Sequence, residues 1–430
     1  MRKQYSFENS KKLWLEAQDI IPGGSQATRA PLYPEFPTYF KKAKGCRMWD
    51  VDGNEFIDLL CSIGPIILGY AYDRVDNAVR EIMKDSFQSS MNHPIQLELA
   101  RLLIEVIPCA EQVRFLKTGT EATQAAARLA RHITKRTYIA RCGYHGWADM
   151  WWYGKTEGIP KAAWETIPRF NGAAEDLENL FKKTNEPFAA VILCPADTRP
   201  FTKENYQAIV DIAHRHGALV IFDEVKTGFR TSLGGAQELL GVTPDITTVS
   251  KGMGNGYPIS AVVGKEEYMR RMPETPTAGT FSVEAISIAA AIETIREIKE
   301  KNVVGHLWNS GQRLIDGLNK ICRDYNMDEP RAYADPVPSM PRFTWKSGED
   351  NPQHPVHQYF FGECVKYGLF FSQWHVAFVN YSHKNEDIDE ALDICDFVMA
   401  KTKKYAANIS GNANYKKTVV HKSNPVKAAT

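Results

Sequence analysis

The run from Ala218 to Val225 constrains the fold of this chain more than any other stretch. It is mostly apolar, rich in β-branched and aromatic residues, and reaches the carboxylates Asp223 and Glu224 near its end. A short apolar run of this kind is typical of a strand that is buried on both faces of a parallel sheet. We therefore expect Asp223 at the carboxyl edge of that sheet, where α/β proteins bind ligands.

A lysine follows the next strand-like run. Residues 246–249 form this second run, and Lys251 precedes the glycine-rich sequence 252–258, which we expect to be a turn and not a helix. The Lys251 amine can then reach the same crevice as Asp223. This pair indicates covalent amine chemistry, although a helix-capping or magnesium-binding acid and a solvated loop lysine are common alternatives.

The composition is that of a globular protein. The 430 residues are 43% hydrophobic and 24% charged, enough for a large core that we expect to form one large and one smaller domain. The 52 basic and 51 acidic residues leave a net charge of +1. No overall field attracts nucleic acid or an anionic membrane, so small molecules are the expected ligands.

Cysteine usage and the N-terminal residues favour a cytoplasmic protein. The eight cysteines show no C-x-x-C pair and no tight cluster with histidine, which argues against a disulfide framework and against a metal site. Residues 1–20 are polar and charged, and no window offers about 18 uninterrupted apolar residues. We expect neither a signal peptide nor a transmembrane helix.

Strand and helix patterns alternate along the middle of the chain, which predicts an α/β fold. We expect a large domain with a mostly parallel central sheet flanked by helices, and a smaller α+β domain formed by the C-terminal part with the N-terminal segment. The expected parts are an N-terminal helix and meander (1–65), the large domain (66–310), the small domain (311–407) and a disordered tail (408–430). The predicted helices are 10–21, 75–83, 96–107, an alanine-rich helix ending at 133, 205–216, 284–299, 312–325, 356–367 and 388–401. The predicted strands are 39–40, 46–50, 55–59, 113–117, 136–141, 189–193, 218–225, 246–249, 259–263, 342–345, 370–371 and 377–379.

Two further strand ends carry groups suited to a ligand. Strand 113–117 runs into Thr118-Gly119-Thr120, where free backbone amides, a helix dipole and two hydroxyls converge as in a phosphate site. A plain helix N-cap explains the same residues. After strand 136–141, glycines flank Tyr144 and His145, so the Tyr144 ring can stack on a flat ligand or simply pack.

A phosphate site, a stacking aromatic ring, a carboxylate and a lysine on the turns of one sheet are the parts that pyridoxal 5′-phosphate requires. The lysine forms a Schiff base with this cofactor, and the carboxylate keeps its pyridine nitrogen protonated. For this chemistry Lys251 must be available as a neutral amine, which desolvation favours by lowering its pKa.

With these residues the chain resembles the class III, fold type I pyridoxal-phosphate aminotransferases, and it is most similar in pattern to their glutamate-1-semialdehyde 2,1-aminomutase branch. The resemblance covers roughly residues 10 to 405 and consists of several motifs in the family's order. They are Pro22-Gly23-Gly24, Trp49 to Asn54, Gly64 to Gly69, Thr118 to Thr123, Tyr144-His145-Gly146, Asp223-Glu224-Val225, Thr227 to Arg230, Gly234 to Gln237 and Gly279-Thr280.

The resemblance implies a role for each matched residue. Lys251 would hold the cofactor as the internal aldimine and carry the proton at Cα, and Asp223 would pair with the pyridine nitrogen. The other implied cofactor-binding residues are Val225 under the ring, Tyr144 over it, His145 of the same motif, Gly119 and Thr120 at the phosphate, and Thr280. Thr280 would come from the neighbouring subunit, which implies a homodimer with shared active sites. Arg29 matches an arginine that meets a substrate carboxylate.

The chain departs from the family pattern at positions expected to set the substrate. Cys194-Pro195-Ala196 replaces Glu-Pro-Val, so a carboxylate near the ring is expected to be lost and the Arg199 guanidinium gained, either for the substrate or toward solvent. Trp374 and His375 stand where the aminomutase branch has Phe and Glu, and they are further candidates for the substrate pocket. The loss of that acid and the sequence after Lys251 favour a transaminase over an aminomutase.

The implied activity is a ping-pong transfer of an amino group from a carboxylate-bearing amino acid or amine to an oxo acid. An intramolecular aminomutase, a racemase that uses the same lysine, and a non-catalytic binding protein of the same fold are the alternatives. The sequence does not name the substrate.

Overall fold

The computed structural model describes residues 2–26, 33, 35–152, 157–327, 330–344 and 354–410. Contacts group the chain into two compact units. One unit comprises Met1–Leu60, Asn309–Val379 and His383–Thr430, and the other comprises Cys61–Trp308 and Asn380–Ser382. In the described part of the chain, no helix is long and apolar enough to cross a lipid bilayer.

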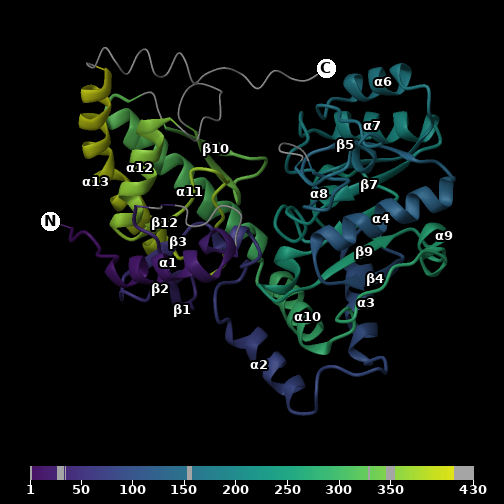
Figure 1. Ribbon diagram of the computed structural model, residues 1–430, viewed down its shortest axis with the longest axis horizontal. Helices are drawn as coiled ribbons and strands as arrows, with labels where there is room; N and C mark the ends of the chain where they lie inside the picture. Colours follow the sequence, from purple (N-terminus) through teal and green to yellow (C-terminus); the bar gives the residue numbers. More distant parts are fainter. Residues whose placement is uncertain are drawn as a thin grey trace. The chain divides into compact units, whose positions relative to one another are not determined.

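The second unit is built on a six-stranded sheet in the order β4-β9-β8-β7-β6-β5 (Figure 1). The strands are β4 (Gln112–Leu116), β5 (Tyr138–Cys142), β6 (Phe188–Leu193), β7 (Leu219–Asp223), β8 (Ile246–Val249) and β9 (Ser260–Gly264). Strand β9 is antiparallel to both of its neighbours, and β5, β6, β7 and β8 are parallel to one another. The prediction of a mostly parallel central sheet is therefore confirmed, with β9 as the reversed strand.

The sheet is buried on both faces because its apolar strands feed two hydrophobic cores. Ile221 and Ile192 belong to one core, whereas Val220 and Phe222 belong to the other, as the alternation of side chains along a strand requires. Helix α4 (Gly119–Thr134) packs in the first core, and α6 (Ala174–Lys183) and α7 (Lys203–Arg215) pack in the second.

The strand register brings the predicted site residues to one edge. Leu193 of β6 pairs with Phe222 of β7, and Asp223 of β7 pairs with Thr248 of β8. The chain leaves β6, β7 and β8 just beyond these pairs. The residues that follow, including Lys251, therefore share the carboxyl edge of the sheet.

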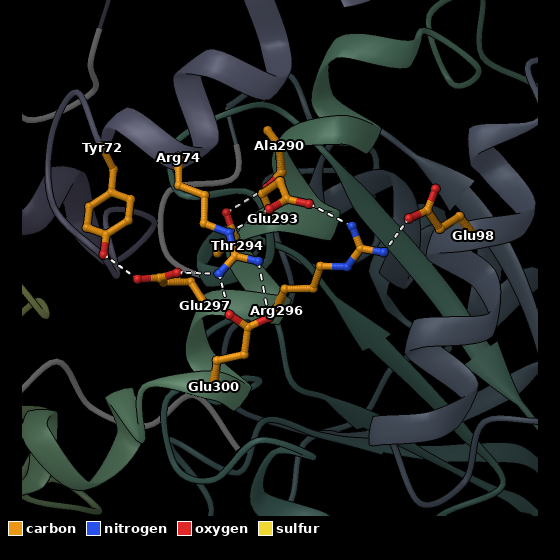
Figure 2. A network of polar contacts seen from close by, with 9 residues as sticks. All are labelled: Tyr72, Arg74, Glu98, Ala290, Glu293, Thr294, Arg296, Glu297 and Glu300. Carbon is orange, nitrogen blue, oxygen red and sulfur yellow. Dashed lines mark hydrogen bonds and ion pairs between the residues drawn. The ribbon is translucent and has the colours of Figure 1, made fainter. Parts of the chain in front are cut away.

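An ionic network clamps α2 (Asp73–Met83) to α10 (Ala285–Glu300), as Figure 2 shows. The guanidinium of Arg74 bonds Glu293 at 2.6 Å and Glu297 at 2.5 Å. Arg296 joins the same helix to Glu98 of α3 (Ile95–Val106) at 2.5 Å. From α2, Asp76 accepts a 3.0 Å hydrogen bond from Tyr257 in the loop after Lys251, so the clamped helices also support that loop.

The first unit joins both ends of the chain in one sheet. Strands β1 (Phe40–Lys44), β2 (Arg47–Asp50) and β3 (Glu55–Asp58) form the predicted antiparallel meander, and β12 (Leu369–Phe370) pairs parallel to β3. Strands β10 (Arg331–Ala334) and β11 (Pro341–Thr344) form a separate hairpin. The main helices are α1 (Glu8–Ile20), most of α11 (Val303–Asp324), α12 (Pro355–Lys366) and α13 (Asn385–Ser410). This arrangement confirms the expected smaller α+β part that contains the N-terminal segment.

Short elements complete the chain. They are the helices α5 (Lys161–Trp164), α8 (Ala236–Leu240) and α9 (Glu266–Met269), and the 3₁₀ turns η1 (Pro22–Gly24), η2 (Cys61–Ile63), η3 (Lys251–Gly254) and η4 (Met272–Glu274).

Some local predictions were wrong. Residues 377–379 form no regular strand, because Ala377 and Phe378 donate separate hydrogen bonds to Pro341 and Leu59 and not to one ladder. The segment after Lys251 contains the 3₁₀ turn η3, although it was expected to have no helix. Strand β10 and helix α6 were not predicted. Trp345 and residues 411–430 of the expected tail lie outside the described residues, and the proposed domain boundaries remain predictions.

Helix α11 offers a stability test with a control in the same helix. A Cβ on the buried Gly311 would overlap the carbonyl group of Pro338, which is backbone, whereas one on Gly305 would meet only the Asn302 side chain. We expect Gly311→Ala to lower the free energy of unfolding by about 1–3 kcal/mol. Gly305→Ala is expected to change it by less than about 1 kcal/mol. Urea unfolding of both variants measures this difference, and equal values would contradict the packing at Gly311.

Candidate active site

Asp223 is a buried carboxylate held by three donors. It is 2% exposed, and its Oδ2 lies 2.8 Å from Nδ1 of His145. Its Oδ1 accepts from the backbone amide of Val225 at 3.2 Å and from Thr248 Oγ1 at 3.3 Å. These three contacts hold the carboxylate in one orientation at the end of β7.

His145 fixes the orientation of Asp223. The ring is 1% exposed and packs edge-on against Trp151, with ring centroids 5.3 Å apart. The carbonyl of His145 accepts a 2.7 Å bond from Thr123 of α4. Its Nε2 is buried and has no hydrogen-bond partner among the described residues. His145 was predicted to bind the cofactor. In the structure its Nδ1 contacts Asp223, so His145 positions that carboxylate.

Lys251 begins the 3₁₀ turn η3 directly after β8 and Ser250. Its backbone is left-handed, with φ of 41°, which is costly for a non-glycine residue and frequent at functional sites. Burial lowers the pKa of Lys251 to about 8, and the charge of Lys226 acts in the same direction, while Cys194, Asp223 and Asp197 oppose it. An amine with this pKa is partly neutral at physiological pH and can act as a nucleophile.

The loop after Lys251 is fixed by the segment 66–69. The Asn255 side chain accepts from the Leu68 amide at 2.9 Å and donates to the Gly69 carbonyl at 3.0 Å. Ser250 Oγ donates to Ile259 at 2.8 Å across the same loop. These contacts fix the backbone of the turn that begins at Lys251.

The turn before α4 leaves two amides open. Thr118 and Glu121 form a capping box, in which Thr118 Oγ1 accepts from the Glu121 amide at 3.2 Å and Glu121 Oε2 accepts from the Thr118 amide at 2.8 Å. The backbone amides of Gly119 and Thr120 have no partner among the described residues. Two free amides at the start of a long helix are suited to a phosphate group.

Close packing joins this turn to the other strand ends. A Cβ on Gly119 would lie 2.8 Å from Val225 Cγ1, so only glycine allows the helix start to touch the residue that follows Asp223-Glu224. Gly146, with φ of +118°, approaches Thr120 in the same way. The structure therefore brings together Gly119, Thr120, Val225 and the Tyr144-His145-Gly146 turn, as the motif order implies.

Glu224 is structural, although it neighbours Asp223. It is 1% exposed and accepts from the Gln237 amide and the Gln237 side chain, both at 3.1 Å, and from Thr227 Oγ1 at 2.9 Å. Burial raises its pKa. Its lone pairs are used to anchor α8, which leaves Asp223 as the carboxylate that faces the site.

The remaining predicted residues, Tyr144 and Thr280 for the cofactor and four for the substrate, lie in different surroundings. Tyr144 is 48% exposed, and Arg199 donates to its neighbouring carbonyl on Thr198 at 2.9 Å. Thr280 is exposed, and its carbonyl accepts from Gln88 at 3.0 Å. Trp374 and His375 belong to the first unit, where both are half-buried and His375 Nδ1 lies 3.1 Å from the Val376 carbonyl. Arg29 lies outside the described residues.

Two site residues were missed by the sequence analysis. A carboxylate was expected to be lost after β6, but Asp197 supplies one: its Oδ2 lies 3.3 Å from the Tyr144 amide and its Oδ1 lies 3.5 Å from Nζ of Lys226. Lys226 follows Val225, and a cation three residues after a cofactor carboxylate was the signal that could have identified it.

The residues present fit pyridoxal 5′-phosphate. The open amides of Gly119 and Thr120 suit its phosphate, the buried Asp223 suits a protonated pyridine nitrogen, and Lys251 is an amine of lowered pKa. All of these groups belong to one unit and lie on turns of one sheet.

Comparisons with known proteins agree with this fit. Residues 28–332 match the family Aminotransferase class-III. The chain is 34% identical over 416 residues to a 3-aminobutyryl-CoA aminotransferase of Cloacimonas acidaminovorans (strain Evry), covering 94% of this chain and 100% of that relative. It is 35% identical over 423 residues to a glutamate-1-semialdehyde 2,1-aminomutase of Persephonella marina (strain DSM 14350 / EX-H1), covering 90% and 97%.

A solved structure shows the same fold with the cofactor. The FumI protein of Sphingopyxis sp. MTA144, in its PLP internal aldimine form, superposes with a TM-score of 0.87 at 28% identity, covering 93% of this chain and 98% of that one. The predicted fold, enzyme class and cofactor are thereby confirmed. The chain belongs to the class III aminotransferases, and it is a pyridoxal-phosphate-dependent enzyme of this family.

Proposed function

We propose that this enzyme transfers an amino group between two separate molecules, and that its donor is a 3-amino acyl compound, either a 3-amino acid or its thioester. The observation that carries the chemistry is Lys251, an amine of lowered pKa on the strand end next to Asp223. Similarity to the 3-aminobutyryl-CoA aminotransferase along its whole length supports the donor class.

Each residue then has a defined task. Bound pyridoxal phosphate supplies an electron-withdrawing ring that makes the proton on the amino-bearing carbon acidic. Asp223, oriented by His145, would keep the ring nitrogen protonated, and Lys251 as a neutral amine would carry the proton of the amino-bearing carbon. The amides of Gly119 and Thr120 would hold the phosphate.

Transfer between molecules is favoured over an intramolecular shift by the residues at 374 and 375. Trp374 stands where the aminomutase pattern has Phe, and His375 stands where it has the acid expected to meet an amino group. The similarity to several glutamate-1-semialdehyde 2,1-aminomutases makes aminomutation the second candidate.

We propose a homodimer in which Thr280 serves the partner's phosphate site. The support is an exposed apolar surface on two adjacent segments, in which Phe87 is 40%, Met91 79%, Leu97 60% and Phe281 65% exposed. The segments are joined by hydrogen bonds from Gln88 to the Thr280 carbonyl and from Ala285 to the Phe87 carbonyl. A second copy of the chain would bury these side chains beside Thr280.

We also propose that the enzyme works in the cytoplasm. All eight cysteines are free and buried. Unpaired thiols are typical of proteins from a reducing compartment. Burial raises the pKa of Cys109 to about 12 and also raises that of Cys194, so these thiols are unreactive.

The donor class is tested by the absorbance of the full-length holoenzyme. With one 3-amino acid or 3-aminobutyryl-CoA and no acceptor, we expect the band of the lysine-bound cofactor to be replaced by that of its amine form, and an oxo acid to restore it. Lys251→Ala is the control, and it should never show the band of the lysine-bound cofactor. If only glutamate-1-semialdehyde changes the spectrum, the enzyme is an aminomutase. If no amine changes it, the proposed amino transfer is wrong.

The pKa of Lys251 predicts how covalent loading of the cofactor depends on pH. Only the neutral amine attacks, so the rate should fall about tenfold for each pH unit below about 8, and level off above it. Stopped-flow absorbance of the cofactor-free protein mixed with pyridoxal phosphate measures this rate. A rate that keeps rising to pH 10 would show an ordinary lysine.

Sharing of active sites is tested by mixing two inactive variants. Lys251→Ala lacks its own amine, and a Thr280 variant lacks the contribution to the partner's site. Equal mixtures that exchange subunits should recover about a quarter of the wild-type activity, because half of the dimers then contain one complete site. No recovery in a confirmed mixed dimer would place Thr280 outside the partner's site.

The exposed Phe281 is part of the apolar surface proposed as the dimer contact. A Phe281→Glu variant should therefore be monomeric, which light scattering measures.

A further inference from the structure

Lys226 is a half-buried cation on the strand end beside that of the reactive lysine. Its side chain is 14% exposed, and its Nζ lies 3.5 Å from Asp197 Oδ1. An ammonium group has three donors, and among the described residues this long contact is the one side-chain partner of Nζ. Lys226 is therefore held in no close ion pair among these residues, and its charge can act on other groups at this edge of the sheet.

The strand register places the two lysines together. Asp223 pairs with Thr248 across β7 and β8, and Lys226 and Lys251 each follow three residues beyond their member of that pair. The two lysines therefore follow adjacent strand ends, and the positive charge of Lys226 lowers the pKa of Lys251, after the larger effect of burial.

Asp197, an exposed residue in the loop after β6, is the carboxylate partner of Lys226. Its carboxylate accepts from the Tyr144 amide at 3.3 Å, and a Cβ on Gly143, with φ of +95°, would lie 3.1 Å from Asp197 Oδ2. The loops after β5 and β6 thus hold the carboxylate that faces Lys226. The Lys226–Asp197 pair joins the loops that follow the neighbouring strands β7 and β6.

We propose that Lys226 and Asp197 are positioning residues that control the charge of Lys251, Lys226 by repelling its protonated form and Asp197 by moderating that repulsion. This inference rests on the proposed use of Lys251 as a neutral amine. The other groups that act on Lys251 are Asp223 at the end of β7 and Cys194 after β6, and His145 faces the two carboxylates from the loop after β5. None of these is changed in the variants below.

The two residues act in opposite directions. Lys226→Gln removes a positive charge, so Lys251 should hold its proton to higher pH. Asp197→Asn removes a negative charge and leaves Lys226 unopposed, so Lys251 should lose its proton at lower pH. A merely structural pair would not shift Lys251 in opposite directions, because loss of either partner would disturb the same contact.

The test is trace acetylation of the full-length, cofactor-free protein with acetic anhydride between pH 6 and 11, read by mass spectrometry on the peptide that contains Lys251. We expect a midpoint near pH 8 in the wild type, about one pH unit higher in Lys226→Gln and about one lower in Asp197→Asn. Lys226→Arg keeps the charge and should match the wild type. Lys182, an exposed lysine remote from the sheet edge, is the internal reference.

An unchanged midpoint in Lys226→Gln, or shifts in the same direction in both variants, would overturn the inference. Lys226→Met gives the same comparison if the glutamine variant does not fold. The result is separate from the proposed function, because acetylation reports the charge of Lys251 whether or not the holoenzyme transfers an amino group. Opposite shifts in a protein without transfer would contradict only the proposed reaction.

Discussion

The site depends on the hydrogen bond between the buried carboxylate of Asp223 and Nδ1 of His145. The Asp223 carboxylate is 2% exposed, and His145, Thr248 and the Val225 amide contact its oxygens, as a buried polar group requires. With Asp223 held in one orientation, a protonated pyridine ring would have a defined partner. The other groups of the site take their positions around this one interaction.

The parallel register of β6, β7 and β8 places further charged residues at the same edge of the sheet as Asp223. One strand end carries Asp223 and Lys226, the next carries Lys251, and the loop after β6 carries Asp197. The Lys251 amine therefore lies in a field made by two carboxylates and one ammonium, in addition to the burial that lowers its pKa. Burial and the charges at this edge of the sheet together set the pKa of Lys251, and no single contact does so alone.

Much of the site could be predicted because its signals are local. Asp223 ends an apolar run, Lys251 follows one, and Gly119 stands between hydroxyls at a strand-to-helix turn, so each position was clear without tertiary information. The Lys226–Asp197 pair could not be predicted, because it joins loops 29 residues apart and depends on the strand order. Residues 377–379 were misassigned for a related reason, since an apolar extended segment can bond to two different partners and form no ladder.

The central claim is that Lys251, and not its neighbour Lys226, carries the cofactor. Borohydride reduction of the holoenzyme makes the bond between lysine and cofactor permanent, and peptide mass spectrometry then locates it. We expect the reduced cofactor on the peptide with Lys251 and none on the peptide with Lys226. Attachment to Lys226 would contradict the account of both lysines.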